Sequence, residues 1–182
     1  MFVQHVALKP IPPHARVEQA AITQVLERLS GGHAVLQDTL DGGFRRMELQ
    51  HPALCDFVAE ELSRIDGPAP QTLGYFLFVV VYLAFVEAFG PRLGALDDAA
   101  IELTRARLHT DGELRDAGTA GDSYSEDLVA VGQPALVRLL RTEIERALSE
   151  APGGQEWRDA EPPYEALLIQ ILALTQAVRP QP

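Results

Sequence analysis

The segment 75–86 carries no charged residue, and this restricts the fold of the chain more than any other feature. It reads YFLFVVVYLAFV and runs on to Phe89, where Gly90 and Pro91 stop it. Its valines and aromatic residues would suit a buried strand, but its length favours a helix. Glu87 interrupts the stretch before the roughly 20 apolar residues that a membrane span needs. A helix that is apolar on every side belongs inside a core, so we predict a buried core helix.

Helical periodicity bounded by proline or glycine recurs along the chain. Proline suits the first turn of a helix, where its missing N–H costs nothing, and glycine or proline commonly follows a helix end. Asp97 or Asp98 can cap the fourth of these segments. The pattern predicts an all-α fold, a compact helical bundle of about six main helices. We expect them over 17–30, 52–65, 71–89, 98–109, 134–149 and 164–178.

Three pairs of these segments resemble each other in the same order along the chain. The pairs are 17–30 with 96–109, 52–64 with 134–146, and 75–89 with 164–178. Alanine- and leucine-rich helices can align by chance, but three matches in the same order are harder to obtain that way. We therefore interpret 17–178 as a single domain with a pseudo-two-fold internal duplication, built from two related three-helix halves, 17–90 and 96–178. Residues 1–16 are expected to form an extended N-terminal arm, and 179–182 a frayed tail.

The segment 33–49 leaves two structures open. Asp41-Gly42 between two short semi-apolar runs is typical of a β-hairpin. The same glycines can instead end a short helix. We favour the short helix.

The chain is acidic, with a formal net charge of −11. Nucleic-acid backbones and anionic membrane surfaces repel such a protein, so we expect neither as a partner. Lys9 is the only lysine among 15 cationic residues, a bias that GC-rich coding produces and that favours a bacterial source. The single cysteine, Cys55, excludes an intramolecular disulfide, and the N-terminus lacks a signal-peptide pattern. Both observations favour the cytoplasm.

The common motifs of catalysis and cofactor binding do not occur in the sequence. Neither GxxxxGK[ST] nor GxGxxG is present for phosphate, neither HExxH nor CxxC for zinc, and no GxSxG for a nucleophile. We therefore predict no catalytic residue, no cofactor and no metal.

Glu48, His51 and Cys55 come closest to a metal-ligating pattern. Glu48 and His51 straddle the helix start at Pro52 and cannot share one helical face, so we expect a solvated turn there. His51 and Cys55 have a spacing that zinc ligands can have, but no second pair accompanies them. Cys55 matches Val137 in the other half, which predicts a buried core position.

Glu61–Arg64 and Glu143–Arg146 recur with the same i, i+3 spacing in the two halves. This spacing permits a surface ion pair worth about 0.2–0.5 kcal/mol. A sharper hypothesis is that the two pairs meet across the pseudo-two-fold axis and fix how the halves dock.

The leading functional hypothesis is a non-enzymatic protein–protein interaction or adaptor module, with self-association as a homodimer among its forms. It would act through an acidic surface or an apolar groove. The alternative is a small-molecule-binding protein or an enzyme with a cavity between the halves, lined by Tyr82, Glu87 and Tyr164. A third hypothesis, peripheral membrane association, rests on 75–86 alone.

Overall fold

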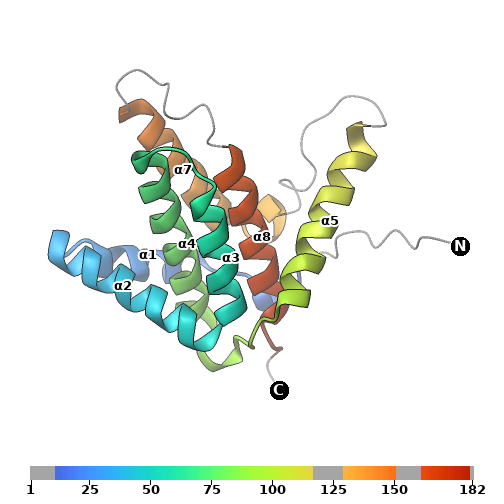
Figure 1. Cartoon of the computed structure of the whole chain (residues 1–182). Coiled ribbons are helices and arrows are strands. Elements are labelled where there is room, and N and C mark those ends of the chain that lie inside the picture. The colour runs from blue at the N-terminus through green and yellow to red at the C-terminus, as the bar shows by residue number, and fades with distance from the viewer. Residues whose placement is uncertain (1–10, 117–128, 151–160, 181–182) are drawn as a thin grey trace, which may run out of the picture.

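The computed structural model describes residues 11–116, 129–150 and 161–180, and this part of the chain is all-helical, as predicted (Figure 1). Within these ranges the only extended pairing is an isolated antiparallel bridge between Leu93 and Val178. Residues 129–132 are helical directly before α7. The main helices are α1 (Gln19–Leu29), α2 (His33–Gln50), α3 (Pro52–Ser63), α4 (Pro68–Phe89), α5 (Asp98–Asp116), α7 (Pro134–Glu150) and α8 (Glu161–Ala177), with 3₁₀ turns η1 (Pro13–Ala15) and η2 (Gly90–Arg92).

α4 is the central helix, and α1, α2, α3, α7 and α8 all pack against it. Its residues from Leu77 to Tyr82 are buried without a break. The buried Gln170 of α8 donates a hydrogen bond from Nε2 to the Phe78 carbonyl oxygen at 3.0 Å. The prediction of a buried helix, rather than a strand, is therefore confirmed for this segment.

The stretch Pro68–Arg92 is also long and apolar enough to cross a membrane, the one such helix in the described ranges. The core helix of a soluble protein meets the same criterion. Here 56% of the most apolar window is buried inside the fold. The helices packed around α4 cover this surface as they would cover a core helix.

α2 is one continuous helix over the segment where the sequence left a short helix or a hairpin open. The hairpin is wrong, and the described ranges hold seven main α-helices where about six were predicted. Gly42 and Gly43 lie inside α2 and do not end it. Gly43 is buried against Val79 and Leu83 of α4, where a side chain has no room. Close packing of α2 on α4 outweighs the low helix propensity of the glycines.

Other helix boundaries follow the proline and glycine signals. Pro52 and Pro134 each take the first position of a helix. α4 ends where Gly90 adopts φ +48°, a left-handed conformation that glycine adopts without strain. Asp97 caps α5, since its Oδ1 accepts the Ala100 N–H at 2.8 Å.

The chain just before α1 packs on Gln133, which interrupts the helical chain between residues 129–132 and α7. At this break the buried Gln133 donates from Nε2 to the Ala15 carbonyl oxygen at 2.7 Å and accepts the Val17 N–H at 2.8 Å. Its Nε2 also lies 3.0 Å from the Thr175 hydroxyl oxygen of α8. These bonds fasten the end of the predicted arm to the C-terminal part of the fold. Residues 1–10 of that arm lie outside the described ranges.

Both predicted ion pairs form. Arg64 lies 2.5 Å from Glu61, and Arg146 lies 2.5 Å from Glu143. Arg105 of α5 also reaches Glu61 at 3.1 Å and so links α5 to α3. Among the described residues, no ion pair joins Arg64 to Glu143 or Arg146 to Glu61. The hypothesis that the two pairs meet is therefore wrong.

Candidate binding groove

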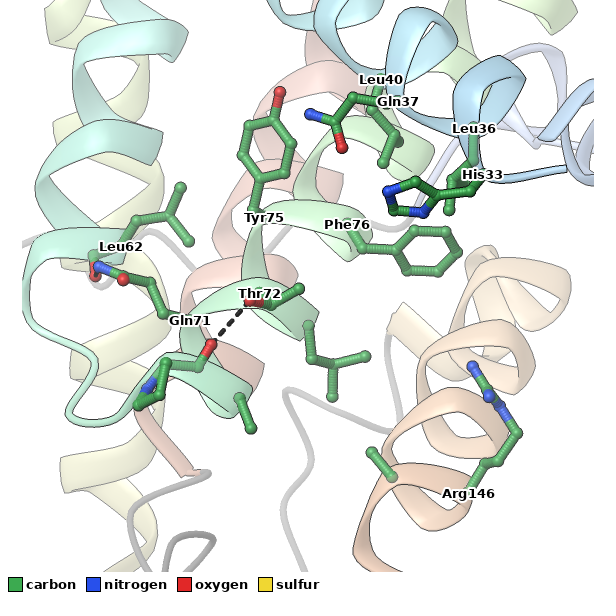
Figure 2. A pocket seen from close by; sticks show the side chains of 14 residues that line it. His33, Leu36, Gln37, Leu40, Leu62, Gln71, Thr72, Tyr75, Phe76 and Arg146 are labelled. Carbon is green, nitrogen blue, oxygen red and sulfur yellow. Dashed lines mark hydrogen bonds between the residues drawn. The ribbon is translucent and has the colours of Figure 1, made fainter. Parts of the chain in front are cut away.

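An open groove of about 1010 Å³ lies between α2, α4 and α7, with the end of α3 at one side (Figure 2). Small side chains help to leave this space unfilled. Ala69 and Thr72 stand on the first turns of α4, and Ala147 lines the groove from α7. Longer side chains at these positions would fill the space between packed helices. The groove is therefore a consequence of which residues the facing turns carry.

Most of the groove surface is aliphatic or aromatic. Figure 2 shows the Phe76 ring reaching from α4 into the space between α2 and α7. α2 adds Leu36 and Leu40, and the end of α3 adds Leu62. Apolar surface on three helices is typical of sites that bind apolar ligands or the apolar face of a peptide.

Polar side chains surround this apolar surface. Tyr75 lies among them on α4, and its hydroxyl donates a hydrogen bond to Asp41 Oδ1 of α2 at 3.3 Å. Burial, together with the charge and the hydrogen bond of Asp41, raises the pKa of Tyr75 to about 12. The phenol therefore stays protonated near neutral pH and acts as a hydrogen-bond donor rather than as a base.

Arg146 stands on α7 at the far side of the groove, as Figure 2 shows. Its guanidinium group bonds Glu143 one turn earlier and lies 3.7 Å from Glu150 one turn later. The hydrogen bond that Arg146 donates to Glu143 raises the pKa of Arg146, so its charge is permanent. On the α7 side of the groove, the charge of the lining residue Arg146 is thus paired with two carboxylates.

The three residues predicted to bind a ligand lie apart from this groove. Tyr82 is fully buried in α4, where its hydroxyl lies 3.4 Å from Gln50 Oε1. Glu87 forms an ion pair with Arg28 at 2.8 Å, which links α4 to α1. Tyr164 is half-buried on α8. The structure does not bring the three into one cavity.

The residues that line the groove were not predicted, because the partial exposure of a side chain depends on how the helices pack in the folded protein. Phe76 and Leu73 belong to the apolar helix that the sequence identifies, but nothing in the sequence says which of its turns stays open. The small residues Ala69 and Thr72 precede the large ones, but small residues also occur where helices pack closely, as at Gly43, so they do not single out an open turn.

The cluster that most resembled a metal site is arranged differently from the prediction. His51 is buried, so the expected solvated turn is wrong. Cys55 is buried, as predicted, and burial raises the pKa of its thiol. In the described ranges no three His, Cys, Asp or Glu side chains gather in a way that could hold a metal ion.

Comparison with protein-family models, with curated proteins and with solved structures finds no match for this chain. Its function must therefore be inferred from its own geometry.

Proposed function

We propose that the protein is a non-enzymatic interaction module that binds an amphipathic helix of a protein partner in the groove between α2, α4 and α7. The observation that carries the proposal is the apolar surface of three helices around an open space of about 1010 Å³. Small-molecule sites occupy about 300–1,000 Å³ and enclose most of their ligand. A larger, open groove suits a helix that lays one apolar face into it.

Charge indicates what the other face of that helix carries. Asp41 accepts a hydrogen bond from the lining residue Tyr75, and Glu143 and Glu150 form ion pairs with the lining residue Arg146. The net charge of the chain, −11, has the same sign. A partner helix with basic residues on its polar face is attracted to this surface, and an acidic one is repelled.

A synthetic peptide with leucine at i, i+3, i+4 and i+7 and lysine elsewhere tests the proposal by fluorescence anisotropy. We expect micromolar binding, and none for a peptide of the same composition with the spacing scrambled. Thr72→Arg places bulk and positive charge in the groove and should weaken binding at least about tenfold.

Thr23→Arg is the matched control for that variant. Both threonines are exposed on a helix and donate from the hydroxyl to the carbonyl of the residue four earlier, Thr23 to Gln19 at 3.0 Å and Thr72 to Pro68 at 2.7 Å. Thr23 lies on α1 and does not line the groove. Equal binding by the two variants, or equal binding of both peptides, would contradict the proposal.

A second candidate is a small-molecule-binding protein that uses the same groove. The groove lies between α4 of the first predicted half and α7 of the second, although the residues expected to line a cavity between the halves, Tyr82, Glu87 and Tyr164, do not line it. Native mass spectrometry of the purified protein separates the two candidates. A reproducible extra mass on a monomer favours the small molecule, whereas a bare chain or a dimer favours the interaction module.

We also propose that the domain arose by internal duplication and works in the cytoplasm. The duplication is supported by two matching helix breaks, at His51-Pro52 and Gln133-Pro134. At each break the polar residue donates its N–H to the carbonyl four residues earlier, at 2.7 Å and 2.6 Å. At each break its own carbonyl accepts from the residue four later, at 3.0 Å and 3.1 Å.

A further inference from the structure

A second and more polar pocket of about 340 Å³ lies at the break between α2 and α3. The end of α2 and the break supply Arg46, Gln50 and His51. The connection from α4 to α5 supplies Pro91, Leu93 and Ala95 on the other side. The pocket is separate from the groove and does not share a lining residue with it.

His51 is the feature of this pocket that requires an explanation. The residue is 3% exposed, and its Nδ1 atom has no hydrogen-bond partner. A buried polar atom without a partner costs about 1–3 kcal/mol, so folded proteins rarely leave one. The His51 side chain that carries this enclosed atom lines the pocket, so a rotation of the ring toward the pocket lets a bound molecule supply the missing partner.

At the matching break before α7, the residue in the same position has hydrogen-bond partners for its side chain. Gln133 is also fully buried and also precedes a proline. Its side chain bonds the backbone of Ala15 and Val17 and the hydroxyl of Thr175. The protein therefore fills one break with its own chain and leaves a pocket at the other.

The side chains in the pocket present hydrogen-bond donors. Gln50 Oε1 accepts from Arg46 Nε at 3.1 Å and lies 3.4 Å from the Tyr82 hydroxyl. Two donors thus occupy the oxygen of Gln50, and its amide N–H groups remain available as donors. Arg46 contributes a full positive charge, and none of the lining side chains is a carboxylate. Such a set is complementary to an anion.

His51 fits this set as a neutral donor. Burial, and after it the charge of Arg46, lowers the pKa of His51. A neutral imidazole carries one N–H, and the tautomer with hydrogen on Nδ1 turns the unpartnered atom into a donor. An oxygen acceptor in the pocket selects that tautomer.

We propose that this pocket binds the carboxylate of a small organic acid. One arginine matches the single charge of a carboxylate better than the near-double charge of a phosphate. Pro91, Leu93 and Ala95 offer apolar contact to the carbon part of the ligand. The volume, about 340 Å³, is within the range of small-molecule sites.

NMR titration of the isotopically labelled protein tests the proposal, with butyrate as the probe. We expect saturable shifts of the His51 ring nitrogens and of the Leu93 and Ala95 amides, in the millimolar range. Butanol and butylammonium have the same carbon chain without the negative charge and should not cause these shifts. Saturation by inorganic phosphate at lower concentration than by butyrate would overturn the assignment to a carboxylate.

Two neighbouring arginines provide the matched variants. Arg46→Gln removes the charge from the pocket and should weaken butyrate binding at least about tenfold. Arg45→Gln removes a charge from the next position of α2, which is exposed and does not line the pocket, and should leave binding within about twofold. Equal affinity in the two variants, or shifts that rise linearly without saturating, would overturn the proposal. Because both arginines are exposed, both variants are expected to fold.

Discussion

A Cβ atom placed on Gly43 of α2 would stand 2.8 Å from Cγ1 of Val79 on α4. Both terminal methyl groups of Leu83 would lie 3.2 Å from the same atom. The two helices therefore approach more closely here than a residue with a side chain allows. The contact has a wider consequence, because α2 carries part of the groove before Gly43 and part of the polar pocket after it.

Gly43→Ala should destabilise the fold by about 1–3 kcal/mol, because the new methyl group must push the buried Val79 side chain away. Urea denaturation followed by circular dichroism measures the change. Gly42→Ala is the control: the position is exposed, with nothing within 4 Å of an added Cβ. It should leave stability unchanged or raise it by up to about 1 kcal/mol through helix propensity. Similar stabilities for the two variants would show that the close approach is not a constraint.

The same contact explains what the sequence could and could not predict of the fold. The main helices were predictable because proline and glycine punctuate them and because each has an apolar face. For α2 a short helix was favoured, but its continuation through Gly42 and Gly43 was not predictable, since these glycines break helices by local propensity and the contact that overrides this lies on α4. Local signals identify elements, but they do not report which backbones touch.

The sites were less predictable than the helices, for a related reason. Tyr82 and Phe76 both belong to the uncharged segment predicted as a buried helix. Nothing in that segment distinguishes Tyr82, which is buried, from Phe76, which borders the groove. His51 precedes a proline at a helix start, a position that is usually solvated. It is buried instead, beside the connection that carries Pro91 and Leu93. Exposure depended in both cases on segments distant in the chain.

Gln133→Ala should destabilise the protein by about 1–3 kcal/mol, because it leaves the buried N–H of Val17 and the carbonyl of Ala15 without partners. Hydrogen exchange at the Val17 amide should also speed up, since this bond holds the chain before α1 in place. Gln24→Ala on α1 is the control, because Gln24 is exposed. If Val17 exchange were unaffected, the Gln133 bond would not be what fastens this segment.

Arg105→Ala should cost more stability than Arg64→Ala, although both arginines bond Glu61. Arg64 forms its pair within α3 with a half-exposed side chain, so its loss is expected within about 0.5 kcal/mol. Arg105 bridges α5 to α3 and also lies over the Phe57 ring, 5.3 Å from its centroid. Its loss should cost about 1 kcal/mol. Thermal unfolding of the two variants compares them directly, and a larger loss for Arg64→Ala would mean that the bridge between α3 and α5 contributes little.

The neutral His51 should make stability depend on pH in a defined direction. Burial and the Arg46 charge lower the pKa of His51 in the folded protein below the ordinary value of 6.5. Tyr82 on the facing helix stays a neutral phenol, because burial raises its pKa to about 12. Between the folded pKa and 6.5 the unfolded chain binds more protons than the folded one, so stability falls as the pH falls through this window. Above pH 6.5 the contribution of His51 is fully present.

Comparison with His51→Gln isolates this term, because glutamine does not titrate and the other histidines are common to both proteins. Urea denaturation at a series of pH values should show wild type losing stability relative to His51→Gln as the pH drops below 6.5. A difference that stays constant, or that moves in favour of wild type on acidification, would mean that His51 accepts a proton in the folded protein as readily as in the unfolded one. Below pH 6.5 the pocket would then hold an imidazolium rather than the neutral ring on which the carboxylate site was built.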